Sequence, residues 1–505
     1  MSDKNKNTVF KAALMLSIFS GLSKILGFAR EQVIAWRFGA SALVDSYVAA
    51  LVIPTVLSGI LGGAIAVAFL PVFSTERAKG SGHRLAGTVF ALTAFVSLIT
   101  TIIAFAFAPQ IISVLVRDFS LELQALTTSL LRIMAVLTFV MSMTQLLTIL
   151  FQAHKQFFWP ALTPIVMNAI IAVGLVLGGN IQWLAWLTVL GMLIPVMLMT
   201  YVAWRRGLPL ITRLIMGDPA FKQVMRLSGP IFFSSLFGQL YLLVDRRLAS
   251  GLDTGSLAAL NFGNKLVQLP LGIFVMALTA AVYPTLAEHA AKGDKASFAQ
   301  SLSSSLRGVT LLLVPAAVGM FVLRYPIVRL AFERGSFDAV ATTRTAQALG
   351  YYSIGLIGAA LAQVLGRGFY SMQDTMTPVK VGVATAFVNV ALAVILVRPL
   401  AHGGLALANS LGFLFNALLL FYFLSSKLSK GSIRLLPLLI KVSGAAVVMG
   451  LVASLVLRVT INFGQVISLG MAVGVGVGVY GLLLIMLRVE EVTTVIKVVR
   501  TRLGI

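Results

Sequence analysis

The chain has 505 residues, of which 59% are hydrophobic and only 11% are charged, and its mean hydropathy is +0.98. Soluble domains carry about 25% charged residues, so this composition excludes a water-soluble globule. A net charge of +23 would suggest nucleic acid in a soluble protein, but here most basic residues fall in short loops between apolar runs. We therefore expect no nucleic-acid partner, and the absence of cysteine excludes disulfides and thiolate chemistry.

Long apolar runs follow one another along the whole chain. Backbone groups inside a bilayer must be paired within a helix or a closed barrel, and long apolar runs favour helices. At about 20 residues per crossing, the sequence predicts an all-α polytopic membrane protein with about 14 transmembrane helices. These spans are expected to begin near residues 9, 43, 85, 128, 159, 182, 224, 257, 307, 345, 378, 403, 435 and 465.

Basic residues are concentrated in alternate loops, which predicts that both termini of this inner-membrane protein face the cytoplasm. Few basic residues fall in the opposite loops. The residues placed inside are Lys4, Lys6, Arg77, Lys79, Arg84, Lys155, Arg205, Arg206, Arg213, Lys292, Lys295, Lys427, Lys430, Arg434, Lys497, Arg500 and Arg502.

Short motifs recur in the same order in two halves of the chain, at an offset that grows only from 211 to 218 residues. Each half holds six spans, so the sequence predicts two parallel six-helix repeats and two extra C-terminal helices. The predicted domains are an N-lobe over residues 1–205, a cytoplasmic linker and C-lobe over 206–426, and the last two spans with a cytoplasmic tail over 427–505. Such repeats are typical of transporters with a site between the halves, rather than of enzymes. The matching pairs are Phe10-Lys11 and Phe221-Lys222, Pro71 and Pro284, Phe151 and Phe369, and Pro160 and Pro378.

Three charged residues interrupt the first span: Lys24, Arg30 and Glu31. A charge near a span centre costs about 2.5–3.5 kcal/mol, so each needs a partner, a water-filled cavity or a function. On an unbroken helix Lys24 and Arg30 point about 120° apart, and a bend at Gly27 would bring them together. In the alternative interpretation, the Lys24 side chain extends to the membrane–water interface, and Arg30 forms an ion pair with Glu31 near the outer interface.

Lys265 in the eighth span is the corresponding cation of the second half. Cations from opposite halves suit a substrate with clustered negative charge, such as a pyrophosphate. The alternative is a Lys265 paired with Asp245 or Asp45. Asp45 opens the second span, where it either caps its own helix or closes an outer gate.

Asp245 lies in the seventh span beside Arg246 and Arg247, and a local ion pair is one interpretation. The other is a site for a coupling Na⁺ ion, with Asn389 and Asn409 as neutral oxygen ligands. Beyond this ion, the sequence predicts no cofactor and no catalytic residue.

The last predicted span carries Gly470, Gly474 and Gly478 at four-residue spacing. This spacing favours close helix packing, and a groove for a lipid tail is the alternative.

The string from Lys24 to Glu31 resembles the opening of the MurJ (MviN) lipid II flippases, which belong to the multidrug/oligosaccharidyl-lipid/polysaccharide (MOP) exporter superfamily. The resemblance covers nearly the whole chain. It continues through Phe38-Gly39-Ala40, Asp45, Pro54, Ala68-Phe69-Leu70-Pro71-Val72-Phe73, Leu269-Pro270-Leu271-Gly272 and Thr377-Pro378-Val379-Lys380.

The resemblance implies a fourteen-helix flippase that moves undecaprenyl-pyrophosphate-linked peptidoglycan precursor to the outer leaflet by alternating access, with the two extra helices forming a groove for the polyprenyl tail. The family usually carries arginine where this chain has Lys24 and Lys265. The alternative function is a flippase for another polyprenyl-diphosphate oligosaccharide, and we expect a monomer in the bilayer. The implied headgroup-binding residues are Ser23, Lys24, Arg30, Glu31 and Lys265, the implied gate residue is Asp45, and the implied sodium ligands are Asp245, Asn389 and Asn409.

Overall fold

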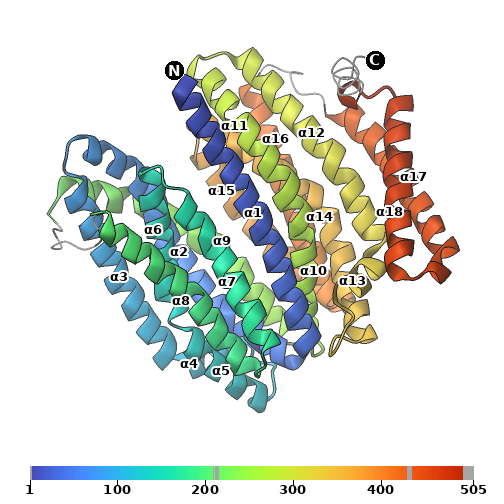
Figure 1. Cartoon of the computed structure of the whole chain (residues 1–505), viewed down its shortest axis with the longest axis horizontal. Helices are drawn as coiled ribbons and strands as arrows, with labels where there is room; N and C mark the ends of the chain where they lie inside the picture. The colour runs from blue at the N-terminus through green and yellow to red at the C-terminus, as the bar shows by residue number, and fades with distance from the viewer. Residues whose placement is uncertain (1–2, 209, 211–214, 216, 429–434, 493–505) are drawn as a thin grey trace. The chain divides into compact units, whose positions relative to one another are not determined.

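The computed structural model describes residues 3–208, 210, 215, 217–428 and 435–492, and within them the chain forms helices and no strand (Figure 1). Helices of the first part are α1 (Asp3–Phe38), α2 (Ala42–Ala78), α3 (Gly82–Ala106), α4 (Ala108–Leu115), α5 (Leu121–Met134), α6 (Leu137–Ala153), α7 (Phe158–Val176), α8 (Ile181–Arg205) and α9 (Pro219–Ala249). They are followed by α10 (Ser256–Pro270), the π-helix η1 (Leu271–Val275), α11 (Met276–Ala291), α12 (Lys295–Val322), α13 (Arg324–Phe332), α14 (Ala339–Ser371), α15 (Met376–Leu400), α16 (His402–Lys427), α17 (Leu436–Val459), the 3-10 helix η2 (Ile461–Phe463) and α18 (Gln465–Met486).

Among the described residues, twelve helices or helix pairs are long and apolar enough to cross a membrane, which confirms the all-α, multi-span prediction. The two other expected spans are α1 and the segment α10–η1–α11. The second is divided by the π-helix into pieces of 15, 5 and 16 residues. The predicted basic residues Arg213, Lys430, Arg434, Lys497, Arg500 and Arg502 lie outside the described residues, as does the end of the predicted C-terminal tail, 493–505.

The predicted repeat is visible in the turns that follow α2 and α11. Gly80 (φ +82°) and Gly293 (φ +68°) both adopt the left-handed conformation. In each turn the next residue donates its amide to the carbonyl five residues earlier, at 3.0 Å. This is a helix ending that glycine favours because it lacks a Cβ. The repeat therefore extends from sequence to backbone conformation.

A second pair of turns, after α6 and α14, repeats in the same way. Lys155 (φ 57°) and Gln373 (φ 59°) are left-handed although they are not glycine. The residue after each donates to the carbonyl of Phe151 at 2.8 Å and of Phe369 at 3.0 Å. Both phenylalanine rings are fully buried, so each ring anchors the end of its helix.

Contacts divide the chain into two compact units, residues 1–258 with 334–337, and residues 259–333 with 338–505. Helix α9 belongs to the first unit and packs on α2, where a Cβ on Gly59 would lie 3.0 Å from Nε2 of Gln239. The repeat instead makes α9 the counterpart of α1 and assigns it to the second half. Packing units and repeat halves are thus different divisions of the chain, and the predicted lobe boundaries stay a prediction.

The extra helices α17 and α18 pack on each other, and α17 packs on α12, within the second unit. Val442, Ala446 and Met449 of α17 form a buried cluster with Val314 of α12. The hydroxyl of Tyr480 on α18 donates to the carbonyl of Leu311 on α12 at 2.8 Å. The two helices outside the repeat are therefore fixed to a helix of the second half.

Candidate substrate-binding site

Lys24 is a partly buried cation on α1 that makes no hydrogen bond or ion pair with any residue the structure describes. The turn around it is held by α7, because Nδ2 of Asn168 donates to the carbonyl of Ser23 at 3.2 Å. Gly27 leaves room for this amide, since a Cβ there would lie 3.2 Å from the same nitrogen. The packing thus positions Lys24 while leaving its ammonium available to a ligand.

Arg30 and Glu31 form an ion pair, which is the alternative that the sequence left open for Arg30. Glu31 is almost completely buried, and Nε of Arg30 is buried without a partner among the described residues. Nearby, the hydroxyl groups of Tyr47 and Thr188 are hydrogen-bonded at 2.9 Å. Arg30 therefore keeps donor groups for a ligand, Nε among them, but has a neutralising carboxylate beside it, so Lys24 is the more available cation.

Helix α1 is continuous through Gly27. At 100° per residue, Lys24 and Arg30 keep their separation of about 120°, so the convergence expected from a bend at Gly27 is absent in this conformation. In this structure Gly27 serves close packing against Asn168. Asn168 was not among the predicted site residues, although an amide inside an apolar span was a signal for it.

The prediction that Asp45 caps its own helix is wrong. The N-cap of α2 is Ser41, without a side-chain hydrogen bond. Instead, the buried carboxylate of Asp45 accepts the backbone amides of Gly255 at 2.5 Å and Ala258 at 2.7 Å. These amides belong to the start of α10, where unpaired N–H groups and the helix dipole favour a negative charge. Asp45 thus joins two segments more than 200 residues apart in the sequence.

Lys265 lies on α10 in the second unit and is partly buried. Lys24 and Arg30 belong to the first unit, so a shared cationic site stays a prediction.

The three residues expected to bind Na⁺ also fall in different units. Asp245 is partly buried on α9 of the first unit, while Asn389 (α15) and Asn409 (α16) lie in the second. The side-chain oxygen of Asn389 is buried without a hydrogen-bond donor among the described residues, and a free buried oxygen fits a cation ligand. No group of three His, Asp or Glu side chains in the described part of the chain is arranged to hold a metal ion. The sodium site stays a prediction.

An apolar groove of about 520 Å³ runs between α12 and the pair α17–α18. Its walls include Pro270, Leu312, Met449, Val477 and Tyr480. Gly476 also lines the groove, where a Cβ would lie 3.4 Å from Met449.

The close packing expected for Gly470, Gly474 and Gly478 is wrong. A Cβ on any of them would meet no described atom within 4 Å. Among the described glycines of α17 and α18, Gly450 on α17 packs most closely, with Val318 at 2.9 Å from its Cβ position, and the buried glycine of α18 is Gly476. The four-residue spacing of Gly470, Gly474 and Gly478 correctly predicted a helix. It did not identify which face of α18 is buried.

Comparison with known proteins identifies the family. The family model described as "Lipid II flippase MurJ" matches residues 34–474. A protein named lipid II flippase MurJ from Burkholderia cenocepacia is 29% identical, over 90% of this chain and 91% of its own length. One named probable lipid II flippase MurJ from Rhizobium tropici is 30% identical, over 79% of this chain and 78% of its own.

Two solved structures show the same fold. A lipid II flippase MurJ in an inward closed conformation has a TM-score of 0.81 at 24% identity, covering 94% of this chain and 99% of its own. A multidrug resistance MATE transporter of the MOP superfamily has a TM-score of 0.67 at 13% identity, covering 82% and 98%. Together with the match over residues 34–474, these likenesses place the chain in the MurJ family of lipid II flippases.

Proposed function

We propose that this chain carries lipid II, the undecaprenyl-pyrophosphate-linked peptidoglycan precursor, from the cytoplasmic to the outer leaflet of the bacterial inner membrane. It is a multi-pass transporter, and no bond of the substrate is made or broken. The observation that carries the proposal is the unpaired, partly buried ammonium of Lys24 in a membrane helix. Such a group costs about 2.5–3.5 kcal/mol, and an anionic ligand offsets that cost.

The pyrophosphate binds first at Lys24, and Arg30 and Lys265 of the second half contribute in a conformation of the transport cycle in which the cations converge. Charge-assisted hydrogen bonds to phosphate are strong where water is scarce. Lysine offers a point charge rather than the planar fork of arginine, so Lys24 attracts the pyrophosphate without fixing its orientation. The ion pair with Glu31 keeps Arg30 in one position.

The polyprenyl tail lies in the apolar groove between α12 and α17–α18. Burying hydrocarbon there requires no polar partner, and the described walls of the groove supply little other than apolar surface. The headgroup crosses the membrane through the protein while the tail stays in this groove, at the level of the lipid hydrocarbon.

Alternating access requires a contact that closes the outer side and can open. The carboxylate of Asp45 at the start of α10 is suited to this role, because hydrogen bonds to helix-end amides form and break without burying an unpaired charge when water enters. Both termini face the cytoplasm in this scheme, as the basic loops predict. Na⁺ bound by Asp245, Asn389 and Asn409 is the proposed coupling ion, and the protein acts as a monomer.

Complementation tests the proposal in cells depleted of their own lipid II flippase. The unaltered chain and Lys24→Arg should restore growth, whereas Lys24→Ala should not, although it is inserted at a normal level. Lys222→Ala removes an exposed lysine from the first turn of α9 and serves as the control. Growth supported by Lys24→Ala would contradict the site. Purified protein that binds another polyprenyl-diphosphate oligosaccharide more tightly than lipid II would favour the alternative substrate.

A further inference from the structure

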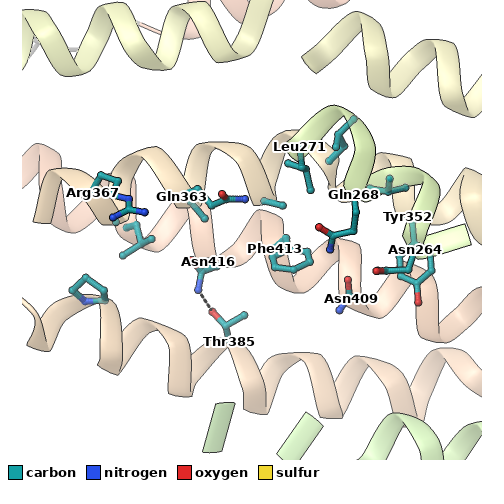
Figure 2. Close-up of a pocket in the computed structure, with 18 of the residues that line it drawn as sticks. Asn264, Gln268, Leu271, Tyr352, Gln363, Arg367, Thr385, Asn409, Phe413 and Asn416 are labelled. Carbon is teal, nitrogen blue, oxygen red and sulfur yellow. Dashed lines mark hydrogen bonds between the residues drawn. The ribbon is translucent and has the colours of Figure 1, made fainter. Parts of the chain in front are cut away.

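A pocket of about 560 Å³ lies entirely within the second unit, between α10, α14, α15 and α16 (Figure 2). More of its lining is apolar than polar, and its polar groups come mainly from amide side chains and from one charged residue, Arg367, with no acidic residue. Figure 2 shows Arg367 at one end of a row of polar side chains and Asn264 and Asn409 at the other. Tyr352 and Arg367 are 15 residues apart on α14, which makes the row about 22 Å long. This length suits an extended ligand.

Four amides of this pocket have unused hydrogen-bonding groups. The side chains of Asn264, Gln268, Gln363 and Asn409 make no hydrogen bond with the residues that the structure describes. An amide that faces hydrocarbon without a partner costs several kcal/mol, so these side chains face water or a ligand. An amide offers both donors and acceptors, and a row of them suits the hydroxyl and acetamido groups of sugars.

Arg367 is exposed at the end of the row and forms no ion pair within the described chain. Its guanidinium lies over the ring of Tyr283, 5.5 Å from the ring centre. This cation–π contact leaves the N–H groups of the guanidinium for a planar anion such as a carboxylate.

The pocket and the apolar groove meet at adjacent residues of one irregular turn. Pro270, the last residue of α10, lines the groove, and Leu271, the first residue of η1, lines the pocket. Lys265 precedes them on the same helix, three residues before Gln268. A lipid with its tail in the groove would therefore have its headgroup beside this pocket.

We propose that this pocket binds the glycopeptide part of the headgroup, with the amides of Asn264, Gln268 and Gln363 contacting the sugars and Arg367 pairing with a carboxylate of the peptide. The inference rests on the proposed function and assigns to it a specificity site separate from the pyrophosphate contacts. The pocket thus distinguishes a complete precursor from a polyprenyl pyrophosphate that lacks sugar or peptide.

Equilibrium binding to the purified full-length protein in nanodiscs tests this assignment with three probes: lipid II, the same lipid without its peptide, and undecaprenyl pyrophosphate. Arg367→Gln should weaken lipid II binding roughly 10- to 100-fold and leave binding of both peptide-free lipids unchanged. Gln363→Leu should weaken binding of the two sugar-bearing lipids about 2- to 10-fold and leave undecaprenyl pyrophosphate unchanged. Arg132→Gln is the matched control, because Arg132 is also exposed and lies 5.8 Å from the ring centre of Phe105.

Binding of undecaprenyl pyrophosphate by each variant also reports that the protein is folded. Equal losses for all three probes, or unchanged lipid II binding by both variants, would overturn the assignment. If the unaltered protein binds none of the three lipids, the proposed function itself fails. That result is distinct from a loss confined to the glycopeptide.

Discussion

The contact between Asp45 and the start of α10 gives a quantitative prediction for Asp45→Asn. The carboxylate accepts two backbone amides, at 2.5 and 2.7 Å. Asparagine keeps one acceptor oxygen, so the variant loses one charge-assisted hydrogen bond and the attraction of a charge to the helix dipole. Together these amount to about 2 kcal/mol. If the contact holds the outer side closed, the ratio of open to closed molecules rises about 30-fold.

Cysteine labelling measures the ratio of open to closed molecules. The chain has no cysteine of its own, so only the introduced thiol reacts. Ser256 is 2% exposed at the first residue of α10, so a Ser256→Cys thiol reacts with a membrane-impermeant reagent only when the contact opens. Asp45→Asn should speed its labelling about 30-fold. Leu121→Cys, at a position 84% exposed, should be labelled equally fast with and without Asp45→Asn. A Ser256→Cys labelling rate that changes less than twofold in folded Asp45→Asn protein would refute the role of Asp45 in closure.

Three further predictions concern separate parts of the molecule. Burial opposes ionisation of Asp374, but hydrogen bonds from Lys427 and Thr377 lower its pKa from 3.8 to about 2. The folded-state pKa is depressed, so this carboxylate stabilises the protein above pH 4 and loses that effect as the pH falls from about 4 to 2. At pH 7 the melting temperature of Asp374→Asn should therefore lie below that of the unaltered protein, by an amount equivalent to about 1 kcal/mol after solvent screening. If this difference in melting temperature is the same at pH 2, the ionised Asp374 carboxylate is not the cause of the stabilisation. Gly476→Leu should fill the apolar groove and slow transport of full-length lipid II more than of an analogue with a short prenyl chain, whereas equal slowing of both would argue against the groove as the tail site. Asn168→Ala removes the hydrogen bond to the carbonyl of Ser23 and should lower stability by about 1 kcal/mol, measured by thermal unfolding in detergent, and an unchanged melting temperature would show that this bond does not hold α1.

The helical fold was predictable because a backbone inside lipid can pair its polar groups only as helices or as a closed barrel. The repeat was predictable from motifs that recur in the same order. Apolar runs of spanning length required helices, and motifs such as Phe151 and Phe369 marked equivalent helix ends that the structure confirms as equivalent turns. The charged residues of α1 were also visible in the sequence, because a charge inside a span is rare.

Contacts between distant segments were not predictable from one sequence. The partner of Asp45 is a pair of backbone amides near residue 255, and backbone amides leave no signature in a sequence. Which face of α18 is buried depends on where α17 packs. The spacing of Gly470, Gly474 and Gly478 therefore predicted the wrong face, because the glycine that faces α17 is Gly476. The polar side chains of the pocket that ends at Arg367 are mostly neutral amides, which a search for buried charges overlooks.

Translocation by the purified protein tests the central claim most directly. The protein is placed in liposomes with fluorescent lipid II in both leaflets, and an impermeant quencher reports how much lipid II reaches the outer leaflet over time. The unaltered chain should make the inner pool of lipid II available to the quencher, and Lys24→Ala should not. Folded, membrane-inserted protein that moves no lipid II, or Lys24→Ala that moves it at the unaltered rate, would contradict the account.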